Sequence, residues 1–326
     1  MNKTERTIYF YDLEVISKSR KYGIERPISI DTAISLIESV PAKTRTKSIS
    51  KGRDTLYISD IKRLENIIAL LVNKSDKRIA DPVFSNPKEH KRRVIEKEKE
   101  EGQDYSSHIL LVKNQNDPSQ SIALVEHCQG LGISAINLAL DSIIKLAKSK
   151  NPQEFKRPDP NGAYDAQGNP KSHEVNHVFE FKGHLSQDLQ EDLNNGIIRS
   201  IDLISERNKY SNIDENSYFQ EKHRMISIIP VDKNTLRNKA FREITRVLES
   251  KKEDYSRARV KFKTQQGLER SVEMDAFNTF AQQYTKKEKI KDFQTELKGS
   301  YDKIHLPIIE KMKELANELA NDQKPT

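Results

Sequence analysis

A pair of strand-like runs followed at once by a long amphipathic segment constrains the fold of this chain most strongly. His108–Lys113 and Ile122–His127 flank the residues Asn116-Asp117-Pro118-Ser119, a pattern typical of a β-hairpin. Ile133–Ala147 then repeats apolar residues at helical spacing and predicts an amphipathic helix. Shorter strand-like runs precede the hairpin. Strands in tight succession before one helix predict an α+β fold of mainly antiparallel strands with flanking helices.

Composition divides the chain into two halves. Asn151–Ser172 holds four prolines and two glycines, so we expect a Pro/Gly-rich linker over residues 151–176. Residues 1–150 would form an N-terminal α+β domain, in which the almost wholly charged Pro87–Gly102 predicts a solvated helix or a loose excursion. Residues 177–326 would form a C-terminal α+β domain. It would end in an amphipathic helix, Ile304–Ala320, suited to packing on its own core or on another subunit.

The bulk features favour a soluble protein of the cytoplasm without membrane insertion. The beginning of the chain lacks the apolar core of a signal peptide. No apolar run approaches the roughly 18 to 20 residues that a membrane span requires. The single cysteine, Cys128, excludes an intrachain disulfide and any zinc site with two thiolates, and we expect a buried thiol.

The net positive charge is confined to one region of the sequence. Lys233–Lys263 contains eleven Lys and Arg against four Asp and Glu, and this surplus of seven equals the formal net charge of +7 of the whole chain. A concentrated surplus creates a positive field that can hold a polyanion, so nucleic acid is the first partner to consider.

The spacing of these cations predicts two rows on one surface. On a helix over Thr235–Ser250, apolar residues fall on one side and basic residues on another. On a strand over Arg257–Lys263, every second residue is basic, so the cations share one face, about 7 Å apart. A second basic segment, Pro41–Arg53, contains no acid and predicts a mobile loop. The candidate nucleic-acid-binding residues are Lys43, Arg45, Lys47, Arg237, Lys239, Arg242, Arg246, Arg257, Arg259, Lys261 and Lys263.

Such rows suit phosphate contacts, which give affinity but little sequence choice. The sequence has no paired Cys/His finger and no aromatic signature of an RNA-recognition motif, so we expect sequence-tolerant binding. Duplex DNA is the expected ligand, and RNA stays open. A solubilising surface, or a basic face with which an inhibitor caps an acidic protein, would carry the same charges. Both are kept as alternatives.

An enzymatic alternative rests on one strand-like segment. Glu180 and Lys182, with Asp159 upstream, fit a loose PD-(D/E)xK nuclease motif, in which two carboxylates hold a divalent metal and the lysine assists the attacking water. Asp159 lies in the Pro/Gly-rich segment rather than on a neighbouring strand, so we assign no catalytic or metal-binding residue.

Gly130–Ala135 has the spacing of a dinucleotide-binding fingerprint, but a tight strand-to-helix turn explains its glycines better. We expect no cofactor.

Three segments carry a resemblance to a known family. They are Thr55–Ile58 (TLYI), Ile226–Val231 (ISIIPV) and Tyr255–Glu273, in which a basic strand turns through a glycine into an acid-containing partner. Together with the order of elements, they resemble the RexA-like DNA-binding proteins of lambdoid phage exclusion and, more loosely, the KwaB proteins of Kiwa anti-phage systems. The resemblance implies a homodimer that binds DNA with little sequence preference, acts in phage defence or exclusion, and signals to a separate effector protein.

Overall fold

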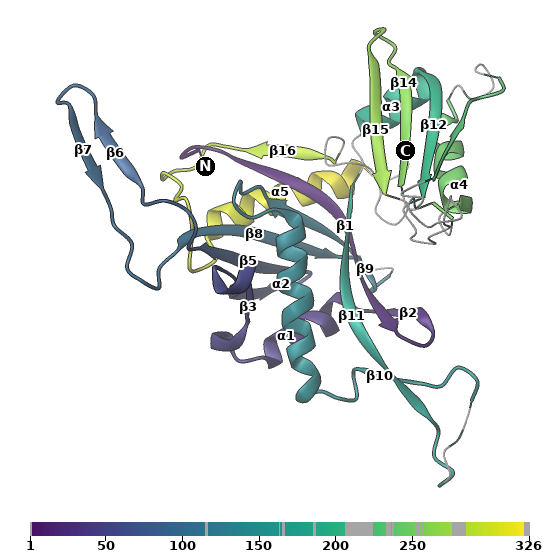
Figure 1. Ribbon diagram of the computed structural model, residues 1–326, viewed down its shortest axis with the longest axis horizontal. Coiled ribbons are helices and arrows are strands. Elements are labelled where there is room, and N and C mark those ends of the chain that lie inside the picture. The colour runs from purple at the N-terminus through teal and green to yellow at the C-terminus, as the bar shows by residue number, and fades with distance from the viewer. Residues whose placement is uncertain are drawn as a thin grey trace, which may run out of the picture. The chain divides into compact units, whose positions relative to one another are not determined.

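The computed structural model describes residues 2–114, 117–162, 164, 167–184, 187–205, 224–232, 236, 238–251, 254–255, 257–275 and 285–322. The chain forms two compact units: unit 1 is Met1–Phe181 with Glu288–Thr326, and unit 2 is Lys182–Lys287. The architecture is α+β with mainly antiparallel sheets and a C-terminal helix, which confirms the predicted fold class (Figure 1).

The two units divide the chain at other points than composition suggested. The Pro/Gly-rich segment belongs to unit 1, because β10 (Lys156–Pro158) pairs with β11 (Ser172–Gly183) and the ring of Phe155 is buried in the unit 1 core. The terminal helix α5 (Leu306–Asp322) also packs in unit 1. Prolines and glycines therefore mark a turn between paired strands here, and unit 2 is an insertion between β11 and β16 (Lys287–Ile290).

Unit 1 is built around a ten-stranded sheet. Its strand order is β10-β11-β1-β9-β8-β5-β4-β3, and β16 and β2 also pair with β1. The ladders from β3 through β4, β5, β8 and β9 to β1 are antiparallel. The remaining strands of this sheet are β1 (Arg6–Ser19), β2 (Gly23–Ile28), β3 (Thr46–Ile49), β4 (Asp54–Leu64), β5 (Ile67–Asp76), β8 (Gln103–Lys113) and β9 (Gln120–Glu126).

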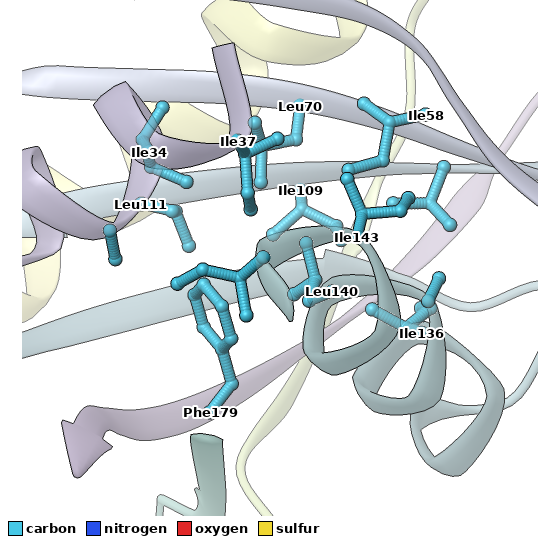
Figure 2. Packing of buried hydrophobic residues seen from close by; sticks show 14 of the residues in the cluster. Ile34, Ile37, Ile58, Leu70, Ile109, Leu111, Ile136, Leu140, Ile143 and Phe179 are labelled. Carbon is cyan, nitrogen blue, oxygen red and sulfur yellow. The ribbon is translucent and has the colours of Figure 1, made fainter. Parts of the chain in front are cut away.

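Both faces of this sheet are covered, which explains why β5 is almost continuously apolar. On one face lie α1 (Ile30–Ser39) and α2 (Ile133–Leu146), and Figure 2 shows Ile37 and Leu140 of these helices in one cluster with Leu70 of β5. On the other face, the alternate residues of β5 pack against α5. The apolar stripe of α5 is therefore buried on its own core.

A two-stranded ribbon extends from the sheet between β5 and β8. It consists of β6 (Val83–Asn86) and β7 (Lys91–Val94), which pair antiparallel and form a small sheet of their own (Figure 1). The charged segment Pro87–Gly102 is therefore neither a helix nor a loose excursion over its first part, because it supplies the turn and the second strand of this hairpin.

Unit 2 is a four-stranded antiparallel sheet with two helices packed on one face. The strand order is β13-β12-β14-β15. Apolar residues of β12, β14 and β15 share one core with Leu193 of α3 and with Ala240 and Ile244 of α4. The elements are α3 (Gln187–Asn195), β12 (Ile197–Ser205), β13 (Arg224–Ile228), α4 (Ala240–Lys251), β14 (Arg257–Lys263) and β15 (Glu269–Asp275).

Candidate nucleic-acid interface

Strand β14 has the alternation that its sequence predicted. Ala258, Val260 and Phe262 are buried in the unit 2 core. Its four cations consequently lie on the opposite face of the sheet, away from α3 and α4. The basic residues of this strand thus share one face, as expected.

Strand β15 has acidic residues in backbone register with these cations. Residues directly opposed in an antiparallel pair lie on the same face of a sheet. The opposed pairs of β14 and β15 are Arg257 with Asp275, Arg259 with Glu273, and Lys263 with Glu269. The alternation on β14 therefore does not by itself create a positive track, because acidic positions of β15 are in backbone register with three of its four cations.

The fourth cation of β14, Lys261, pairs with a carboxylate of β12. Its Nζ lies 2.9 Å from Oδ2 of Asp202, which is buried at the centre of the sheet. The hydroxyl of Ser227 donates to Oδ1 of Asp202 at 2.5 Å. The Ser227 hydrogen bond, followed by the one from Lys261, lowers the pKa of Asp202 below its ordinary value. Lys261 thus compensates a buried charge.

Helix α4 presents its basic row on the other side of unit 2. Because Ala240 and Ile244 pack on the apolar face of β14, the helix lies on the sheet face opposite the strand cations. Lys239, Arg242 and Arg246 are exposed. The helix row and the strand row therefore point away from each other and do not form the single surface that the sequence suggested. Arg237 lies outside the described residues.

The basic segment Pro41–Arg53 of unit 1 is regular structure rather than the predicted mobile loop. A 3₁₀ turn over Ala42–Thr44 leads into β3, the edge strand of the large sheet, and a second 3₁₀ turn over Ser50–Gly52 follows. Gly52 has a φ of 85°, a conformation that glycine adopts without a steric cost. The cations of this segment, called the edge segment below, are therefore carried on ordered backbone.

One predicted binding residue of the edge segment has a structural role instead. The guanidinium of Arg45 donates to the carbonyl oxygens of Val40 at 2.8 Å and Glu38 at 2.9 Å. These carbonyls lie at the C-terminal end of α1, where the helix itself leaves backbone acceptors unpaired. Arg45 therefore caps α1 and is held away from any ligand.

The other cations of the edge segment are free of carboxylates. Lys43, Lys47, Lys51 and Arg53 are exposed, and within the described part of the chain no acidic side chain pairs with any of them. Asp54, next to Arg53 in the sequence, and Asp76 are held by Arg78 and Lys74. The hydrogen bond from Arg78 is the main cause that lowers the pKa of Asp76. Lys51 and Arg53 were not among the candidates, although the acid-free run already contained them.

The β6–β7 ribbon begins beside this edge segment. The backbone N–H of Lys77, at the root of the ribbon, donates to the carbonyl oxygen of Arg53 at 3.0 Å. The edge segment therefore contacts the stretch of chain from which the ribbon extends.

The residues of the possible nuclease motif are not brought together. Asp159 accepts a hydrogen bond from the Tyr22 hydroxyl at 2.7 Å, and its backbone N–H bonds to Lys171. Lys171 directly precedes the extended strand β11, which contains Glu180, and the backbones of the two residues are about 30 Å apart at roughly 3.3 Å per residue. Glu180 instead pairs with Lys18 at 3.2 Å. Among the described residues, no group of three His, Cys, Asp or Glu side chains is arranged to hold a metal ion.

The first of the two glycines after β9, Gly130, has a packing explanation. A Cβ on Gly130 would lie 2.4 Å from the ring of Tyr105, so only glycine fits there. Strand β9 is flanked by antiparallel neighbours, unlike the parallel strand of a dinucleotide-binding unit. Cys128 is a buried free thiol, as predicted, and burial raises its pKa.

A buried charged network ties the two ends of the chain into unit 1. Glu126 accepts from Nε of Arg6 at 2.7 Å and lies 2.6 Å from Nδ1 of His108. Nε2 of His108 accepts from the backbone N–H of His305 at 3.0 Å, which places the ring proton on Nδ1. All three side chains are buried. The network is therefore structural and has no access to a substrate.

No helix in the described ranges is both long enough and apolar enough to cross a membrane. The chain matches no known protein-family model, and no curated protein or solved structure is detectably similar to it.

Proposed function

We propose that this protein binds nucleic acid, with duplex DNA as the expected ligand and little choice of sequence, through the edge segment of unit 1. One observation carries the proposal: the edge segment holds Lys43, Lys47, Lys51 and Arg53 exposed and without a carboxylate partner in the described part of the chain. Phosphate contacts from such cations need no base-reading side chains. Cations on ordered backbone also lose less conformational entropy on binding.

The exposed row on α4 is a second candidate contact of the same kind. Arg242 lies 3.4 Å from Glu243, and this exposed pair is easily exchanged for a phosphate. The cations of β14 are left out of the proposed interface because acidic positions of β15 are in register with three of them and Lys261 pairs with Asp202.

The biological role follows the family resemblance. We place the protein in the cytoplasm as a homodimeric sensor or accessory protein of phage defence or exclusion, which signals to a separate effector. The resemblance is carried in part by Tyr255–Glu273, which contains β14 and most of β15.

The test is binding of a short labelled DNA duplex, followed by fluorescence anisotropy at about 0.1 M salt. The quadruple variant Lys43→Ala, Lys47→Ala, Lys51→Ala, Arg53→Ala should bind about tenfold more weakly or worse. The variant Lys239→Ala, Arg242→Ala, Arg246→Ala serves as the matched comparison in unit 2 and should lose less.

The edge variant should fold normally because its four side chains are exposed, and circular dichroism checks this. Unchanged affinity in the edge variant contradicts the proposed site. Absence of binding by the wild-type protein contradicts the proposed function. The same incubation with Mg²⁺ should leave the duplex intact, and cleavage would move the protein to the nuclease alternative.

A further inference from the structure

The β6–β7 ribbon is exposed along its whole length. Every residue of both strands is exposed, including three large apolar side chains: Val83 is 48% exposed, Phe84 53% and Val94 53%. A two-stranded hairpin alone is only marginally stable in water. Exposed apolar residues gathered on one element mark a binding surface. The ribbon therefore has the features of an arm that is completed by a partner.

The arm is ordered from root to tip by its own contacts. At the root, Lys97 pairs with Asp81 at 3.7 Å, and the N–H of Ile95 extends the ladder to Pro82 at 3.1 Å. At the tip, Asn86 accepts from the N–H of Lys88 through its side chain at 3.2 Å, which closes the turn. These contacts hold the two strands of the arm in register.

Charge is distributed unevenly along the arm. The outer part contains Lys88, Lys91, Arg92 and Arg93 against one acid, Glu89, which pairs with Lys91 at 2.9 Å. The root carries both signs of charge, and its ions are paired: Lys77 with Glu100 at 2.6 Å and Lys97 with Asp81 at 3.7 Å. The surplus of positive charge on the arm is therefore concentrated in its outer part.

The cations leave the arm on both faces. Ser85 is opposite Arg92 and Phe84 is opposite Arg93, and successive residues of a strand point to opposite faces. Arg93 lies over the Phe84 ring, 5.6 Å from its centre, which holds the guanidinium in place. A protein partner that packs on the ribbon would cover only one of its two faces and would leave the cations of the other face in water. Cations on both faces instead match a groove with phosphates along both walls.

We infer that the β6–β7 arm inserts into the major groove of duplex DNA. This inference rests on the proposed function, whose edge segment contacts the arm root through Arg53 and Lys77. The major groove of B-form DNA is about 12 Å wide and admits a two-stranded ribbon. The major groove of A-form RNA is too narrow and deep for side chains to read. The arm therefore selects double-stranded DNA over double-stranded RNA and over single strands.

The test uses the full chain and three labelled probes of one sequence: a DNA duplex, an RNA duplex and a single DNA strand. The variant Lys88→Ser, Lys91→Ser, Arg92→Ser, Arg93→Ser should lose about tenfold or more in affinity for the DNA duplex. Its affinity for the other two probes should change by less than about threefold, because the edge segment is intact. The matched control Lys88→Arg, Lys91→Arg, Arg92→Lys, Arg93→Lys keeps the charge and should keep duplex binding.

Groove entry has its own readout, because the N7 atom of guanine faces the major groove. Wild-type protein should protect guanine N7 from methylation by dimethyl sulfate, and the serine variant should not. Duplex affinity within twofold of wild type in the serine variant, or exposed N7 in the wild-type complex, overturns the inference and leaves the edge-segment proposal standing. The serine variant could instead keep its duplex affinity and lose self-association, as measured by sedimentation. That result would assign the arm to a protein contact and would also overturn the inference. Failure of the wild-type protein to bind any probe removes the proposed function itself.

Discussion

The ammonium of Lys261 and the carboxylate of Asp202 form an ion pair between neighbouring strands of unit 2, with 2.9 Å between Nζ and Oδ2. Asp202 is buried, whereas about half of the Lys261 side chain is exposed. The cation at the centre of the basic strand thus compensates a charge inside the fold. A residue with this role is poorly placed to be exchanged for a phosphate.

Replacing Lys261 should destabilise unit 2. In Lys261→Ala the buried carboxylate of Asp202 keeps the Ser227 hydrogen bond and the attraction of Arg259 but loses its ion pair, so we expect a loss of about 1–2 kcal/mol in the free energy of unfolding. Urea unfolding measures the change. Lys239→Ala removes an exposed cation of the same unit and should leave the unfolding midpoint at its wild-type position.

The pH dependence of stability should reveal Asp202. Its pKa in the folded protein lies below the ordinary value of 3.8, so its contribution is fully present above pH 4 or so and is lost as the pH falls through the folded pKa. The stability gap between wild type and Asp202→Asn should therefore narrow on acidification. A gap that stays constant from neutral pH to about pH 3 would contradict this assignment.

Asp141 of α2 should have the opposite effect on the pH dependence of stability. Burial raises its pKa from 3.8 to about 6, while the backbone N–H of Phe179 donates to it at 2.8 Å. The charged form is thus disfavoured in the folded protein, and stability is lost as the pH rises through about 6. Asp141→Asn keeps the acceptor without the charge. It should stabilise the protein at pH 7 by about 1 kcal/mol, with the gain vanishing near pH 4 in unfolding curves.

Glu126 should be among the least replaceable residues of unit 1. Both of its oxygens accept hydrogen bonds, and the amide of a glutamine would turn a donor toward Arg6 or His108. Glu126→Gln should cost about 3–5 kcal/mol in the free energy of unfolding, measured with denaturant. The matched change Glu174→Gln removes an exposed pair with Lys148 and should be silent. Equal effects of the two changes would show that the buried network contributes no more to stability than an exposed ion pair.

Local patterns in the sequence predicted much of the fold. The helix over Ile133–Ala147 and the alternation of β14 depend on the spacing of apolar residues within one segment, and both are confirmed. The interruption of β12 by a bulge between Ile198 and Ser200 obscured its alternation, and this strand was missed. A pattern within one element can be read from the sequence because it does not depend on which other elements that element packs against.

The candidate site depended on pairings that the sequence does not contain. The register of β15 alone decides which residues are opposite Arg257 and Arg259, and the role of Arg45 depends on where α1 ends. The sequence of the arm has no alternation of apolar and polar residues, because both faces of the ribbon are exposed. The signal that could have found it is the turn sequence Asn86-Pro87 between two short apolar runs.

The salt dependence of DNA binding tests the central claim most directly. Each phosphate contact contributes about −0.9 to the slope of log K against log salt on duplex DNA. If the edge segment makes four such contacts, the variant with Lys43, Lys47, Lys51 and Arg53 replaced by alanine should have a slope shallower by roughly 3 to 4 than the wild type. An identical slope for the two proteins would mean that these cations touch no phosphate and would contradict the account.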